Sequence, residues 1–223
     1  MLVDAGGVRL SCEVTGDPVA PPVVLLHGLG SDGSSWHAVA AALADRWRVY
    51  VPDQRGHGRS DRPGEYSFEL LRDDLLGLLD ALGLARAALV GHSMGGVAAY
   101  LLAQDHPERV ERLVLVETPP PVPRGRPEPV RPDEPTPYDW AVVPAIVAQL
   151  NAPDPAWSTR LPEVTVPTLV VAGGPSSQLP QEKIAWMAER LPDARLVTIP
   201  AGHRVPTEAP ADLAAALRTF LAD

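Results

Sequence analysis

Short runs of consecutive apolar residues recur along the chain, and polar residues do not alternate within them. Valine, leucine and isoleucine dominate these runs, which is typical of strands buried on both faces of a parallel sheet. The pattern predicts six such strands, at residues 23–26, 49–51, 88–90, 113–116, 168–171 and 196–199. In an earlier segment, residues 8–14, apolar and polar residues alternate more regularly, so we expect an antiparallel hairpin at the edge of the sheet.

Segments with helical spacing lie between the apolar runs. In residues 68–82, five leucines fall on one stripe, at Leu71, Leu75, Leu78, Leu79 and Leu82. Helices are also predicted at residues 94–104, 142–150, 181–191 and 212–221. The alternation predicts an α/β fold with a doubly wound, mostly parallel sheet covered by helices on both faces. No repeat and no second apolar core are visible, so we expect residues 1–223 to form a single domain.

One segment breaks this alternation. About every second residue from 119 to 137 is proline, which excludes a helix or a central strand. We expect an extended excursion over the surface, followed by the short helix at residues 142–150. Residues 118–166 are therefore predicted to form a small, proline-rich lid inserted into the domain.

Charge and composition narrow the class of protein. The chain has a net charge of −9 at pH 7, with acidic residues spread along its length. Such a surface repels phosphate backbones and anionic lipids, so we expect neither nucleic acid nor a membrane as partner. The single cysteine, Cys12, excludes an intrachain disulfide. The N-terminus lacks the pattern of a signal peptide, and no apolar run is long enough to span a bilayer, so we expect a cytoplasmic protein.

The strongest chemical signal is the segment Gly91-His92-Ser93-Met94-Gly95-Gly96. Its G-x-S-x-G pattern follows a predicted strand and precedes a predicted helix, which is the context of a nucleophile elbow. The turn lifts the hydroxyl of Ser93 above the sheet, and the flanking glycines avoid collisions with a neighbouring strand and helix. The N–H of Met94 points at the site from a helix N-terminus, where developing negative charge is stabilised.

With this elbow, the segment His27-Gly28-Leu29-Gly30 makes the chain resemble the α/β-hydrolase family, in particular its serine esterases and lipases. The resemblance implies that the N–H of Leu29 joins that of Met94 in an oxyanion hole. It also implies that His203, on the loop after the last predicted strand, is the base. A free hydroxyl is a poor nucleophile until a neighbouring base takes its proton.

The third triad residue departs from the commonest family pattern. The family usually carries an aspartate in the loop after the strand predicted at 168–171, but here that loop has no carboxylate and Ser176 stands in its place. A subset of the fold, including some haloalkane dehalogenases, looks similar in holding its acid where Glu117 ends the preceding strand. Ends of adjacent parallel strands lie side by side, so Glu117 is the predicted acid. The alternative is a solvent-facing glutamate that begins the proline-rich segment.

Other polar residues of the family-like segments are expected to be structural. Asp53, Arg55 and His57 should form a network beneath the site, and His27 should hold the loop that carries Leu29. No pair of histidines has the spacing of a zinc site, so we expect no metal. Two tryptophans of the lid, Trp140 and Trp157, either line a substrate pocket or pack in the core.

These features predict a serine hydrolase that cleaves a carboxylic ester or thioester through an acyl-enzyme. The predicted partner is a small-molecule acyl substrate, and no cofactor is expected. A cofactor-free perhydrolase or haloperoxidase would use the same triad and remains an alternative. A ligand-binding or signalling homologue with low turnover is the other, because the usual aspartate is missing. A haloalkane dehalogenase or epoxide hydrolase is disfavoured, since those enzymes place a carboxylate where this chain has Ser93.

Overall fold

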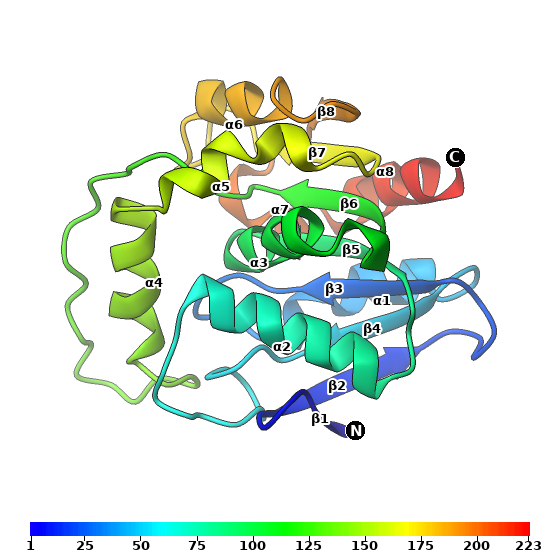
Figure 1. Ribbon diagram of the computed structural model, residues 1–223, viewed down its shortest axis with the longest axis horizontal. Helices are drawn as coiled ribbons and strands as arrows, with labels where there is room; N and C mark the ends of the chain where they lie inside the picture. The colour runs from blue at the N-terminus through cyan, green and yellow to red at the C-terminus, as the bar shows by residue number, and fades with distance from the viewer.

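The computed structural model describes residues 1–223, and its centre is one eight-stranded sheet (Figure 1). The strands are β1 (Leu2–Asp4), β2 (Arg9–Thr15), β3 (Pro22–Leu26), β4 (Arg48–Pro52), β5 (Ala87–His92), β6 (Val110–Val116), β7 (Thr168–Ala172) and β8 (Ala194–Thr198). Their order across the sheet is β1-β2-β4-β3-β5-β6-β7-β8. The pairs β1–β2 and β2–β4 are antiparallel, and all later neighbours are parallel.

Helices cover both faces of the sheet, which confirms the predicted fold class. They are α1 (His37–Leu43), α2 (Phe68–Ala81), α3 (Met94–Asp105), α4 (Val142–Asn151), α5 (Pro155–Thr159), α6 (Gln181–Ala188), α7 (Val205–Glu208) and α8 (Pro210–Ala222). Short 3₁₀ helices are η1 (Gly33–Trp36), η2 (Pro107–Arg109), η3 (Leu161–Glu163) and η4 (Gly202–Arg204). In Figure 1, α2 and α3 lie in front of the sheet and α1 and α8 lie behind it. Each face therefore has its own buried apolar core.

The helix α2 illustrates how the sequence sets an element. The hydroxyl of Ser67, just before the helix, accepts a hydrogen bond from the N–H of Leu70 at 3.1 Å, which caps the first turn. Glu69 adds a negative charge at the positive end of the helix dipole. Four leucines of the predicted stripe, Leu71, Leu75, Leu78 and Leu79, are buried in the core, whereas Leu82 lies just after the helix and is half-buried.

The two edges of the sheet differ in detail from the sequence prediction. The segment predicted as an edge hairpin is β2, which does pair with β1, but β4 covers its other side and leaves β1 at the edge. The strand β8 was predicted to be buried on both faces. It is instead the last strand of the sheet, and Arg195 and Leu196 are exposed there.

The predicted lid has two unlike halves. Residues 119–141 form neither helix nor strand, as their prolines predict, and Figure 1 shows this green segment passing around the outside of α4. The second half packs into the body of the protein. The side chain of Gln149 on α4 accepts a hydrogen bond from the N–H of Phe68 at 2.7 Å, and Ile146 is fully buried. Only residues 122–141 of the lid, none of which is buried, therefore stand outside the packed core.

Two further features follow from burial and length. No helix combines the length and the apolar character that crossing a bilayer requires. Cys12 lies buried in β2, and burial raises the pKa of its thiol to about 12. A thiol that stays protonated is a poor nucleophile, so Cys12 is a packing residue.

We expect residues 127–137 to be the first site of cleavage by a protease of broad specificity, such as subtilisin. Most of these residues are exposed, and no N–H or C=O between residues 123 and 138 takes part in a backbone–backbone hydrogen bond. Trypsin is a poor probe because proline follows both Arg126 and Arg131. Brief digestion and mass spectrometry of the two fragments locate the cut. A first cleavage inside α2 would contradict this assignment.

Candidate active site

Ser93 alone separates β5 from α3: the strand ends just before it and the helix begins just after it. Its φ of +52° is rare for a residue with a side chain and marks a strained turn. A Cβ at Gly91 would collide with the first turn of α3, and a Cβ at Gly95 would collide with the end of β3. The structure thus confirms that a side chain at either flanking glycine would collide with the neighbouring helix or strand, as the sequence predicts.

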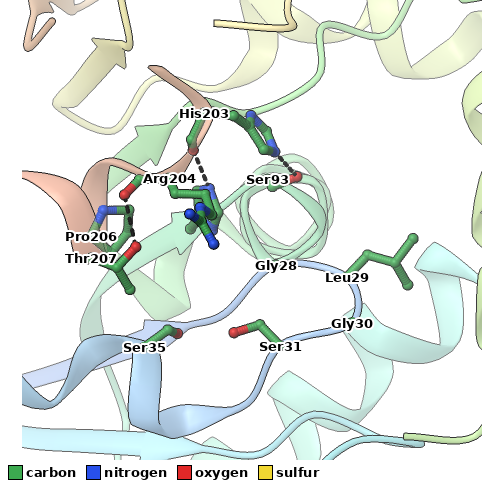
Figure 2. Close-up of a pocket in the computed structure, with 11 residues that line it drawn as sticks. Gly28, Leu29, Gly30, Ser31, Ser35, Ser93, His203, Arg204, Pro206 and Thr207 are labelled. Carbon is green, nitrogen blue, oxygen red and sulfur yellow. Dashed lines mark hydrogen bonds between the residues drawn. The ribbon is translucent and has the colours of Figure 1, made fainter. Parts of the chain in front are cut away.

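His203 reaches Ser93 from the other end of the sequence. It lies in η4, after the edge strand β8, and its Nε2 is 3.0 Å from the Oγ of Ser93 (Figure 2). The carbonyl oxygen of His203 accepts a hydrogen bond from Nε2 of His92 at 2.7 Å. Burial, followed by the charge of His203, lowers the pKa of His92 to about 4. The neutral ring of His92 therefore fixes the loop that carries His203, a role that the sequence analysis missed.

Glu117 follows β6 and lies on the far side of the His203 ring. One of its oxygens, Oε2, is 3.1 Å from Nδ1 of His203. The side chain is completely buried and not exposed to solvent at the strand end. A φ of +46° turns the backbone at Glu117 into the left-handed region. Among residues other than glycine, only Ser93 and Glu117 have a positive φ.

The carboxylate of Glu117 is held by three donors besides His203. The N–H of Gly173 donates to Oε1 at 2.5 Å, and the amide of Gln181 donates to the same oxygen at 3.2 Å. The hydroxyl of Ser177 donates to Oε2. Burial alone would raise the pKa of Glu117, but hydrogen bonds from His203 and these three donors outweigh it and hold the pKa below its ordinary value.

The loop after β7 thus contributes donors where the family usually has an acid. Ser176 was the predicted counterpart of the family aspartate, but Ser177 is the residue that meets Glu117. The sequence carried a signal for this: a loop without a carboxylate has a run of polar groups, and these can satisfy an acid supplied by a neighbouring strand.

A cavity of about 300 Å³ lies between Ser93 and the loop after β3 (Figure 2). Gly28 and Leu29 line it from one side, and His203 lines it from the other. The N–H groups of Leu29 and Met94 donate to no acceptor within the protein. Both are free to bind an oxygen of a ligand, and the volume is at the lower end for small-molecule pockets.

The loop that carries Leu29 is braced from below. Nε2 of His27 accepts a hydrogen bond from the N–H of Gln54 at 2.9 Å, and Nε2 of His57 accepts one from the N–H of Gly30 at 3.1 Å. Burial lowers the pKa of His27 to about 3, so its ring is a neutral acceptor. No group of three or more His, Cys, Asp or Glu side chains is arranged to hold a metal ion.

The other residues of the predicted network also make structural contacts. Asp53 accepts hydrogen bonds from the N–H groups of Gly33 and Arg59 at 2.8 and 3.0 Å. Arg55 forms a buried ion pair with Asp74 at 2.5 Å. These contacts tie the segment after β4 to the loop after β3 and to α2.

The two tryptophans considered as substrate-binding residues lie away from this cavity, since neither Trp140 nor Trp157 lines it. Trp157 is 6% exposed and packs edge-on against Phe68, with ring centroids 5.6 Å apart. It is therefore a residue of the core. A different aromatic residue of the same region, Tyr138, lies over the loop at Gly30. No pattern around Tyr138 marked it in the sequence.

Comparison with known proteins adds to this geometry. A family model described as "alpha/beta hydrolase fold" matches residues 21–141, which is more than half of the chain. A Caulobacter vibrioides protein named as a carbamate hydrolase is 45% identical over 111 residues, covering 48% of this chain and 41% of that protein. Epoxide hydrolase A of Mycobacterium tuberculosis is 42% identical over 122 residues, covering 53% and 38%. The alignments therefore span about two fifths of these relatives.

Among solved structures, a thermophilic esterase from Thermogutta terrifontis matches over the whole fold. It is 28% identical, with a TM-score of 0.81, and the match covers 100% of this chain and 97% of that one. The similarity therefore includes the strands and loops that carry Ser93, Glu117 and His203.

The buried histidine His27 should make stability depend on pH. The unfolded chain binds a proton at this residue below about pH 6.5, whereas the folded chain does not until about pH 3. The contribution of His27 to the free energy of unfolding is therefore complete above about pH 6.5. It is lost as the pH falls below that value, by about 1.4 kcal/mol per pH unit. We expect His27→Gln to flatten the slope of unfolding free energy between about pH 6.5 and 5.5, measured by urea denaturation. Equal slopes in parent and variant would contradict the neutral, buried state of His27.

Proposed function

The chain belongs to the α/β-hydrolase fold family, and from its site we propose that it is a serine hydrolase that cleaves carboxylic esters or thioesters. The observation that carries the proposal is the continuous hydrogen-bonded series from Ser93 through His203 to Glu117, at 3.0 and 3.1 Å. A serine hydroxyl, an imidazole and an ionised acid in this order form the arrangement that activates a serine. The solved thermophilic esterase that shares the whole fold supports an ester substrate.

The chemistry follows from the atoms at hand. Oγ of Ser93 attacks the acyl carbonyl while Nε2 of His203 takes its proton, and Glu117 stabilises the resulting imidazolium. The free N–H groups of Leu29 and Met94 bind the oxyanion. His203 then returns the proton to the leaving alcohol or thiol. A water molecule, activated by the same ring, hydrolyses the acyl-enzyme and restores the hydroxyl of Ser93.

Two rival functions lose support from the same residues. Epoxide hydrolases and haloalkane dehalogenases use a carboxylate nucleophile at the elbow, whereas this chain has Ser93 there. The missing loop aspartate favoured a binding protein with low turnover. The buried, ionised Glu117 supplies a charge in reach of His203 and removes the reason for that alternative.

A fluorophosphonate probe should label Ser93 and no other residue. We expect Ser93→Ala to remove both the label and the hydrolysis of p-nitrophenyl acetate, because Ser93 is the only serine whose hydroxyl is hydrogen-bonded to a histidine. Peptide mass spectrometry identifies the labelled position, and heat-denatured parent protein is the control for non-specific reaction. Label on another residue, or unchanged turnover in the variant, would refute the nucleophile assignment.

Glu117→Gln should lower kcat for the same ester by a factor on the order of 10² to 10⁴, since the equivalent change in serine proteases costs about 10⁴. The amide keeps the size of the side chain but removes the charge, and its NH₂ group faces donors. Glu111→Gln is the matched control, because Glu111 is an exposed glutamate of β6, the strand that Glu117 follows. A loss of only a few-fold in Glu117→Gln would mean that another acid, or none, assists His203.

A further inference from the structure

A second cavity, of about 360 Å³, lies beside the loops that follow β6 and β7. The first part of the proline-rich segment, from Pro120 to Pro127, forms one wall. The other wall is formed by Gln178 and Pro180, which precede α6, and by Lys183 in its first turn. No acidic residue lines this cavity, although the chain as a whole carries a net charge of −9.

Three cationic side chains line the cavity: Arg124, Arg126 and Lys183. None of them forms an ion pair, whereas nine other arginines of the chain do. Lys183 is also the only lysine in the sequence. The cavity therefore concentrates positive charge that the protein leaves without a partner.

Arg124 is half-buried, and its guanidinium group makes no hydrogen bond within the protein. Burial, followed by the charge of Arg126, lowers the pKa of Arg124 to about 10. A desolvated cation without a counter-charge is costly, and an anion bound between Arg124 and Arg126 would offset that cost. The beginning of α6 favours an anion too, since Pro180 caps it without a side-chain hydrogen bond. Glu182, in the first turn of the same helix, does not line the cavity.

The cationic cavity adjoins a hollow that in turn adjoins the proposed active site. Gln178 also lines a shallow hollow bounded by Ser176 and His203. His203 and Arg204 then line both this hollow and the cavity at Ser93.

We infer that the cavity lined by Arg124, Arg126 and Lys183 binds an anionic group, a phosphate or a carboxylate, of the acyl substrate that Ser93 attacks. The inference rests on the proposed function and narrows its substrate class to anionic esters or thioesters. Two sources fit this chemistry. The anion belongs either to a thiol leaving group that carries phosphates or to an acyl group that carries a second carboxylate.

The experiment compares matched substrates in the parent protein and in Arg124→Gln. Acetyl-coenzyme A against S-acetyl-N-acetylcysteamine tests a phosphorylated leaving group. The p-nitrophenyl monoester of succinate against p-nitrophenyl butyrate tests an anionic acyl group. We expect the parent to prefer one anionic substrate, and Arg124→Gln to reduce that preference in kcat/KM on the order of tenfold. Lys183→Gln should act in the same direction. Arg131→Gln is the matched control, because Arg131 is an exposed arginine of the same segment outside the cavity.

Direct binding separates this inference from the proposed function. Calorimetric titration of the parent with coenzyme A and with succinate should show weaker binding in Arg124→Gln than in Arg131→Gln for one of the two probes. Hydrolysis of the neutral substrates without any anionic preference, or an equal loss on neutral and anionic substrates, would overturn the anionic subsite alone. Binding that depends on Arg124 in a protein that hydrolyses none of the four substrates would support the subsite and refute the ester hydrolase.

Discussion

The buried carboxylate of Glu117 is the constraint on which the rest of the site depends. A charge without solvent contact must be satisfied by donors from the protein, because an unpaired buried ion is strongly destabilising. Here the donors come from three separate elements: the loop after β7, the beginning of α6 and the 3₁₀ helix that carries His203. The need to satisfy one charge therefore ties together the C-terminal third of the fold around His203.

Backbone strain coincides with chemistry at two positions. Ser93 and Glu117 are the only residues other than glycine with a positive φ, and each directly follows a strand, β5 or β6. Both residues are anchored by backbone hydrogen bonds to the next strand, from Ser93 to Val116 at 3.0 Å and from Glu117 to Val171 at 2.8 Å. The sheet thus supplies the energy that holds these unfavourable conformations, as is common for residues in functional sites.

The sequence was sufficient for features that depend on local pattern. Apolar runs and helical stripes located the inner strands and the long helices to within a few residues, and the elbow located Ser93. Features that depend on tertiary packing were not accessible in this way. The burial of Trp157 against Phe68, the exposure of β8 and the contact between Ser177 and Glu117 each require knowledge of which distant segments meet. His92 was overlooked for the same reason, since its partner lies 111 residues away.

The register of β5 against β6 has a mechanical consequence. Gly91 pairs with Leu115 and His92 with Val116, so the next residues, Ser93 and Glu117, leave the sheet as neighbours on one rigid ladder. His203 instead stands on a 3₁₀ turn after the outermost strand. The sheet therefore fixes the nucleophile and the acid relative to each other, whereas the position of the base depends on the turn after β8 and on the hydrogen bonds that hold it to Glu117 and His92. A displacement of the end of β8 would therefore move His203 away from Ser93 and stop proton transfer, while Ser93 and Glu117 keep their alignment.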